Sequence, residues 1–127
     1  MSESVLIVLP LPPRELSPNK PPGSRGGRMR KARLVAGYRL KARKAAEAEG
    51  VESGPWGLVS VHATFYHRQR RKRDDVNHLA SLKAAYDGLV DAGLLVDDDS
   101  EHLRTLTPAF AVDKHHPRVE LRIERIA

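Results

Sequence analysis

The sequence predicts a single α+β domain with the element order β-α-β-α-β-β, in which about four strands form a mixed sheet packed with two helices. Two observations predict this class. Apolar or alternating stretches typical of strands occur at 5–9, 58–67, 103–112 and 118–126. Helical composition and spacing occur at 29–49 and 75–92. A length of 127 residues suits one domain with one modest core, so we treat 1–127 as one unit.

The first strand and the segment after it differ sharply in composition. The aliphatic run at 5–9 is closed by Pro10 and predicts a buried strand. The segment at about 14–28 is rich in Pro, Gly, Ser, Asn and basic residues, which predicts a mobile loop. Its basic side chains, Lys20 among them, are candidates for phosphate contact, and an ordinary solvated loop explains them equally well.

The segment 29–49 is rich in Ala, Arg, Lys and Leu and stops before Gly50, which predicts a helix. Its basic side chains gather in its first three-quarters, where the helix dipole favours anions instead. This arrangement indicates a use such as phosphate binding; the alternative is a solvated face.

The stretch 58–67 alternates apolar and polar residues, so one side of a half-buried strand should carry Val59, Val61, Ala63 and Phe65. His62 and His67 are candidate acids or ligands. Because neither has a suitably spaced partner in the sequence, we expect both to be surface residues of the strand.

The predicted helix 75–92 has clear signals at both ends. Asp74 or Asp75 fits the N-cap, Gly93 fits the stop, and Lys83 and Asp87 are four residues apart and can pair. Its buried stripe should consist of Val76, Leu79, Leu82, Tyr86, Leu89 and Val90. Beyond it, 103–112 and 118–126 should form a terminal β-hairpin.

The overall charge and the absence of cysteine narrow the functional classes. Lys and Arg number 22 against 16 Asp and Glu, and the net charge of +6 favours a polyanionic partner. The absence of cysteine excludes disulfides, zinc-thiolate sites and cysteine nucleophiles. The run 5–9 is too short to span a bilayer and lacks the features of a signal peptide, so we expect a cytoplasmic protein without a membrane partner.

The stretch 70–99 combines opposite charges within thirty residues. A basic run at 70–73 precedes Asp74 and Asp75, and a second acidic run occupies 97–99. Lys and Arg bind phosphates, whereas clustered Asp repels them unless a divalent cation lies between. The pattern therefore indicates a Mg²⁺-dependent enzyme acting on nucleic acid. The alternative is that the aspartates only cap a helix and solvate a turn.

Asp74 or Asp75 together with Asp97 or Asp98 would supply the magnesium ligands, and Lys83 would add electrostatic support. A continuous helix 75–92 is about 26 Å long and would separate the two acidic pairs. Either the chain doubles back tightly or a second subunit completes the site.

Several motifs resemble the RusA-type Holliday-junction resolvases. They are R-K-R-D-D-V-N-H-L at 71–79, K-A-A-Y-D-G-L-V-D-A-G at 83–93, the acidic run 97–99, L-P-L-P-P at 9–13 and S-P-N at 17–19. The resemblance implies a homodimer that binds four-way DNA junctions and, with Mg²⁺ (Mn²⁺ as a substitute), nicks two strands symmetrically in DNA recombination and repair.

The resemblance also implies residue roles. The catalytic set is Asp74, Asp75, Lys83 and Asp98, and the metal ligands are Asp74, Asp75, Asp97 and Asp98. The family has an aspartate where this chain has Val76, and Asp75 is the candidate replacement. Candidate DNA-binding residues, from the resemblance and the basic pattern together, are Asn19, Lys20, Arg30, Lys31, Arg33, Arg70, Arg71, Lys72, Arg73 and Asn77.

Two other functions remain open. The first is a non-catalytic protein that binds junction or duplex DNA. The second, which rests on charge alone, is a ribosome-associated RNA binder.

Overall fold

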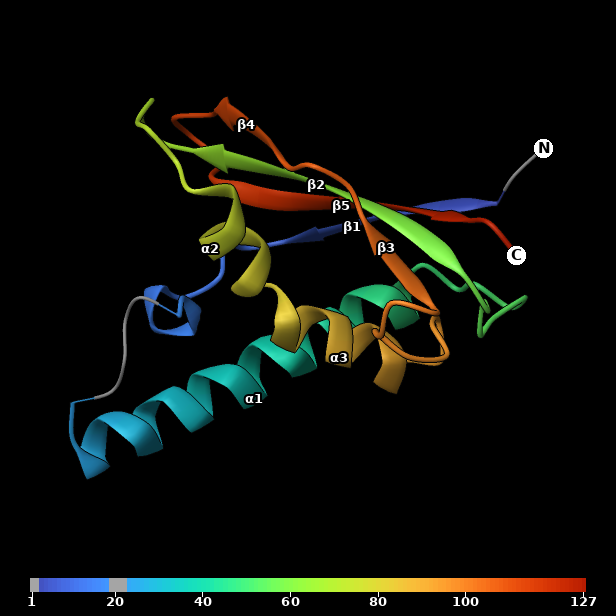
Figure 1. The fold of residues 1–127 in the computed structure, drawn as a ribbon, viewed down its shortest axis with the longest axis horizontal. Coiled ribbons are helices and arrows are strands. Elements are labelled where there is room, and N and C mark those ends of the chain that lie inside the picture. The colour runs from blue at the N-terminus through green and yellow to red at the C-terminus, as the bar shows by residue number, and fades with distance from the viewer. Residues whose placement is uncertain (1–2, 19–22) are drawn as a thin grey trace.

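A computed structural model describes residues 3–18 and 23–127 and shows the predicted α+β class with a mixed sheet (Figure 1). The five strands are β1 (Ser4–Leu9), β2 (Val59–His67), β3 (Leu103–Thr105), β4 (Ala109–Val112) and β5 (Arg118–Arg125). They follow the order β1-β5-β2-β3, and β4 also pairs with β2. The sheet has five strands rather than about four because the stretch 103–112 divides into two before Ala109.

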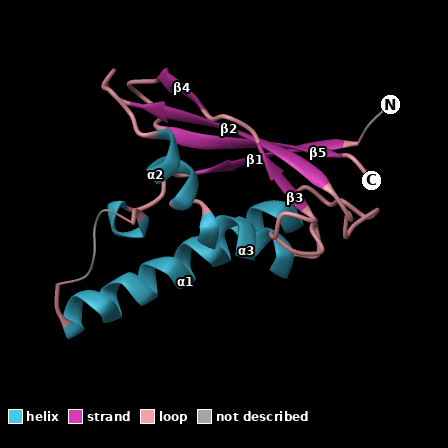
Figure 2. Cartoon of the chain, in the orientation of Figure 1, coloured by secondary structure: helices cyan, strands magenta, loops and turns pink. Residues whose placement is uncertain are grey.

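The helical elements are a 3₁₀ turn, η1 (Arg14–Leu16), and the helices α1 (Arg25–Ala48), α2 (Asp75–Ala80) and α3 (Lys83–Asp91) (Figure 2). Helices α1 and α3 pack against each other on one side of the sheet (Figure 1). No helix in the described ranges is both long and apolar enough to cross a bilayer.

The predicted loop at 14–28 is wrong at both ends. Residues Arg14–Leu16 form η1, and α1 already begins at Arg25. The earlier start follows from Ser24, whose Oγ accepts a hydrogen bond from the N–H of Gly27 at 3.1 Å and so caps the helix. The intervening residues 19–22 lie outside the described residues, so the predicted mobility of this segment stays a prediction.

Strand β1 is buried on one face only, although its sequence is apolar throughout. Val5, Ile7 and Leu9 lie in the core, whereas Leu6 and Val8 are 38% and 49% exposed. The helices cover one side of the sheet, so alternate residues of this edge strand face away from them (Figure 1). The prediction of a fully buried strand is therefore corrected.

Strand β2 presents its predicted face to the core, but the predicted terminal hairpin is wrong. Val59, Val61, Ala63 and Phe65 are buried. Strand β5 pairs antiparallel with both β2 and β1, whereas β4 pairs parallel with the other edge of β2. The segment 113–117 therefore crosses the end of β2, with the N–H of Asp113 donating to the carbonyl of His67 at 2.8 Å.

The predicted helix 75–92 is two helices that break at Ser81 and Leu82. Ser81 Oγ donates to the carbonyl of His78 at 2.6 Å, and α3 begins at Lys83. The break reorients the predicted stripe: Leu82, Tyr86 and Leu89 are buried, whereas Val76 is 73% exposed. Predicting Val76 in the core was wrong because α2 does not share the direction of α3.

Candidate active site

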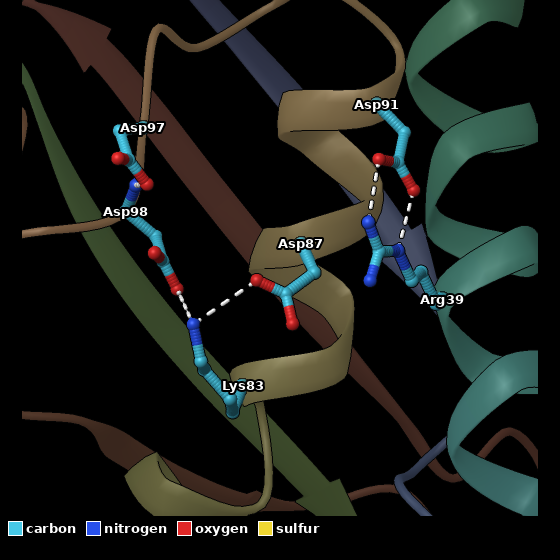
Figure 3. Close-up of polar contacts among 6 residues, drawn as sticks. All are labelled: Arg39, Lys83, Asp87, Asp91, Asp97 and Asp98. Atoms are coloured by element: carbon cyan, nitrogen blue, oxygen red, sulfur yellow. Dashed lines mark hydrogen bonds and ion pairs between the residues drawn. The ribbon is translucent and has the colours of Figure 1, made fainter.

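Lys83 brings carboxylates from two parts of the chain together at the start of α3 (Figure 3). Its Nζ donates to Asp87 Oδ1 at 3.0 Å, one helical turn away, and to Asp98 Oδ2. The N–H of Asp98 donates to Asp97 Oδ1 at 2.7 Å. We call Lys83, Asp87, Asp97 and Asp98 the Lys83 cluster. It confirms the predicted Lys83–Asp87 pair and brings Lys83 together with Asp97 and Asp98.

The charges of the Lys83 cluster stabilise one another. Burial raises the pKa of Asp98, but the hydrogen bond and charge of Lys83 outweigh it and hold that pKa below its usual range. The hydrogen bonds to Asp98 and then to Asp87 raise the pKa of Lys83 above its usual value. The side chain of Asp98 is only 14% exposed, whereas that of Lys83 is 65% exposed. The lysine therefore keeps an open side toward an incoming anion.

The chain doubles back after α3, but it brings Asp98 to Lys83 and does not join Asp97 and Asp98 to Asp74 and Asp75. Gly93 has a φ of 79°, and its N–H donates to the carbonyl of Val90 at 2.9 Å, which ends the helix. Leu95 then forms a parallel bridge with Trp56. Because nine-residue α3 is only about 12 Å long, the residues after Gly93 can return to its first turn.

Asp91, at the end of α3, anchors this helix to α1. Its two carboxylate oxygens accept hydrogen bonds from Arg39 Nε at 2.5 Å and Nη2 at 2.7 Å (Figure 3). These hydrogen bonds lower the pKa of Asp91. The bidentate pair fixes the position of α3, and with it the position of Lys83, against α1.

A second polar region lies at the start of α2, around a cavity of about 620 Å³ that we call the α2 pocket. The loop after β1, the end of β2 and the first residues of α2 supply its walls. The lining residues are Leu11, Pro12, Pro13, Arg14, Ser17, Phe65, His67, Lys72, Arg73, Asp74, Asn77, His78 and Ser81. The pocket thus combines basic side chains with one carboxylate.

Asp74 is the N-cap of α2, as one of the two predicted alternatives. Its Oδ1 accepts the N–H of Asn77 at 3.2 Å, and its Oδ2 accepts the side-chain amide of Asn77 at 3.1 Å. Asp75 is exposed in the first turn of α2. The helix cap therefore fixes the Asp74 carboxylate at the edge of the α2 pocket.

His67 has a partner that the sequence did not reveal. Its Nε2 lies 3.1 Å from Nε2 of His78, and His78 Nδ1 lies 2.8 Å from the carbonyl oxygen of Asp74. Burial first, then the charges of Arg73 and His78, lowers the pKa of His67 to about 4. His67 is therefore neutral near pH 7. The expectation that His67 is only a surface residue of the strand missed this contact, because β2 and α2 are separate elements in the sequence and meet only in the folded chain.

The four predicted metal ligands remain in two separate pairs. Asp74 and Asp75 lie at the start of α2, whereas Asp97 and Asp98 belong to the Lys83 cluster. Within residues 3–18 and 23–127, no three His, Asp or Glu side chains gather closely enough to hold one metal ion. Carboxylate oxygens suit Mg²⁺, but the geometry of one described chain does not complete a single site.

The predicted DNA-binding residues divide by location. Lys72, Arg73 and Asn77 line the α2 pocket, and Arg70 and Arg71 line a neighbouring cavity with Arg73. On α1, Arg33 is exposed, Lys31 is half-buried, and Arg30 Nε donates to Glu15 at 2.9 Å, which ties this arginine to η1. Asn19 and Lys20 lie outside the described residues.

Comparison with models of known protein families finds no match to this chain, and a search of curated proteins finds none either.

Proposed function

We propose that this chain is a Mg²⁺-dependent, structure-selective endodeoxyribonuclease that resembles the RusA-type Holliday-junction resolvases. As a homodimer in the cytoplasm of a bacterial or phage-infected cell, it would cut four-way DNA junctions by paired nicks. Two-fold symmetry in the protein suits a junction that is cut at two matched positions.

The observation that supports this proposal most directly is the composition of the α2 pocket. A fixed carboxylate, Asp74, borders the same cavity as Lys72 and Arg73. Cationic side chains bind a phosphodiester, and a carboxylate beside them becomes useful when a divalent cation joins the two. The pocket therefore offers both the affinity for a DNA backbone and an oxygen ligand next to it.

The chemistry divides between the two regions. Mg²⁺, when bound, would activate water and offset the charge that develops on the phosphate in the transition state. Asp74 would orient the ion at the α2 pocket, with Asp75 as the neighbouring carboxylate. Lys83 would stabilise the developing negative charge, and Asp98, held ionised by Lys83, would contribute a second oxygen ligand.

Completion of the site by a second subunit is part of the proposal, because the two carboxylate pairs lie in separate regions of one chain. Mg²⁺ usually takes one or two carboxylates and fills its remaining positions with water and phosphate oxygens. A second subunit that places its Lys83 cluster opposite the α2 pocket would meet this requirement.

A nicking assay on a synthetic four-way junction, with and without Mg²⁺, tests the proposal. Asp74→Asn and Asp98→Asn should each abolish cleavage while junction binding stays equal to or stronger than that of wild type. Asp99→Asn is the matched control, because Asp99 neighbours Asp98 but contacts His102 instead of Lys83. Retained cleavage by both variants would remove the catalytic assignment.

The second candidate function is a non-catalytic protein that binds junction or duplex DNA. It is favoured by the structural duties of the same carboxylates, since Asp74 caps α2 and Asp98 pairs with Lys83. Junction binding without Mg²⁺-dependent nicking in wild type would select it. A preference for folded RNA over junction DNA would instead select an RNA-binding role.

A further inference from the structure

The imidazoles of His67 and His78 meet at the wall of the α2 pocket from two different elements. His67 is the last residue of β2, and His78 lies in α2. Their Nε2 atoms are 3.1 Å apart, their ring planes are perpendicular, and their centroids are 5.3 Å apart. The two nitrogens therefore face each other, and neither ring stacks over the other.

The contact with Asp74 determines which nitrogen of His78 carries the proton. A carbonyl oxygen can only accept, so His78 Nδ1–H must donate to the carbonyl of Asp74, and the neutral ring has a lone pair at Nε2. His67 then donates its Nε2–H to that lone pair. If the proton of His67 moves to Nδ1, two lone pairs face each other, and a shared cation would stabilise that arrangement.

We propose that His67 and His78 form a two-imidazole binding site for a divalent transition metal of the Zn²⁺ type. Imidazole nitrogen suits such ions, whereas Mg²⁺ prefers oxygen. Two nitrogens bound at roughly 2.0–2.1 Å to a tetrahedral Zn²⁺ are about 3.3 Å apart. The two nitrogens need to move apart by about 0.2 Å, and the rings must tilt so that both lone pairs point at the ion.

The residues around His78 fix the orientation of its ring, as neighbouring groups commonly do for a metal-binding histidine. A ligating histidine usually donates its other N–H to a carbonyl or carboxylate, which fixes its tautomer and orientation, and the Asp74 carbonyl does this here. Phe65 and Phe110 contact the His78 ring edge to face, each with a centroid distance of 4.8 Å. These contacts restrict rotation of the ring.

Both histidines line the α2 pocket, so an ion held between them would be open to that cavity. Because no third imidazole or carboxylate joins the pair within the described ranges, water or a phosphate oxygen would fill the remaining coordination positions. The nearby positive charge of Arg73 weakens binding of the bare ion and favours an anionic third ligand. The site is therefore open, as catalytic zinc sites are, and not closed like a structural one.

Isothermal titration of ZnCl₂ into the untagged 127-residue chain at about pH 7.5, where neutral imidazole is the ligand, tests the proposal. We expect about one equivalent of Zn²⁺, with at least roughly tenfold weaker binding in His67→Gln and in His78→Gln. The matched control is a His115→Gln/His116→Gln double variant, which removes the adjacent surface histidines of the 113–117 turn and should leave the affinity unchanged. Absence of Zn²⁺ binding, or a loss of binding confined to the control, would overturn the assignment.

A measurement on the wild-type chain covers the case in which a pocket variant fails to fold. With ¹⁵N-labelled histidine, Zn²⁺ should shift the Nε2 resonances of His67 and His78 together, and Mg²⁺ should not. Zn²⁺ that shifts only the rings of other histidines would contradict the proposal. Neither experiment contains DNA, so the result is independent of the proposed nuclease activity.

Discussion

Gly88 sets the closest approach between α3 and α1, and replacing it with alanine should destabilise the fold. A Cβ at this position would lie 2.2 Å from the carbonyl oxygen of Arg39, 2.9 Å from Ala42 Cβ and 3.0 Å from the backbone nitrogen of Arg43. Two of these three atoms belong to the backbone of α1 and cannot rotate away. The helices must therefore separate by about 1 Å to restore ordinary contact distances.

The expected magnitude is a difference between two opposing effects. Overpacking typically costs about 1–3 kcal/mol, and the rigid contact with Arg39 places Gly88→Ala toward the upper end of that range. Alanine returns up to about 1 kcal/mol because it has the higher helix propensity. We expect the free energy of unfolding to fall by about 2 kcal/mol.

Gly37→Ala is the matched control, because Gly37 lies inside α1 and, apart from its chain neighbours and the nearby backbone of its own helix, no atom of the described residues lies within 4 Å of its added Cβ. This variant should gain up to about 1 kcal/mol from propensity alone. Urea unfolding followed by far-ultraviolet circular dichroism would measure both variants. If Gly88→Ala were as stable as Gly37→Ala, the close packing of α3 on α1 would be refuted.

Three further outcomes follow from the structure. The buried hydroxyl of Tyr86 has no hydrogen-bond partner in the part of the chain described, so Tyr86→Phe should raise the free energy of unfolding by about 1 kcal/mol, measured in urea. A decrease would show that the hydroxyl makes a hydrogen bond in solution. The hydrogen bonds from Arg39 lower the pKa of Asp91 in the folded chain. The ionised carboxylate therefore stabilises the fold fully above its unfolded pKa of about 4, and this stabilisation is lost as the pH falls through the lower pKa of the folded state. Asp91→Asn should therefore have a lower free energy of unfolding than wild type at neutral pH, and the difference should vanish toward about pH 2. In an Arg39→Met background, the same substitution should have no such pH dependence. If the protein binds duplex arms of a junction, Lys72→Gln should lower affinity and reduce the salt slope by about 0.9, because it removes one cation from the phosphate backbone, and an unchanged slope would place Lys72 away from the DNA.

Local patterns in the sequence predicted much of the fold. Alternation along 58–67 correctly placed Val59 and Phe65 in the core, because side-chain direction in a strand depends only on position. The helix stop at Gly93 and an N-cap at Asp74 or Asp75 were also predictable, because both signals act on their own helix; the structure selects Asp74. The predicted terminal hairpin was wrong because alternation along a strand does not determine which other strand it pairs with.

The parts of the candidate site that depend on tertiary structure could not be predicted. The break at Ser81 and Leu82 involves neither Gly nor Pro, and the surrounding composition favours a continuous helix. A prediction that misses this break cannot place Asp98 beside Lys83. The His67–His78 contact likewise requires β2 and α2 to be placed relative to each other, and no spacing in the sequence indicates it.

Mixed dimers can decide whether the proposed catalytic site is shared between subunits. In a shared site, Asp74 of one subunit works with Asp98 of the other. A dimer of one Asp74→Asn subunit and one Asp98→Asn subunit then contains one site with both changes and one fully intact site. Mixing the two inactive variants should therefore restore nicking of one junction strand. If each site belongs to one subunit, both sites carry a defect and mixing restores nothing. Analytical ultracentrifugation of the wild type provides the independent check, since a fully active monomer would exclude the shared site.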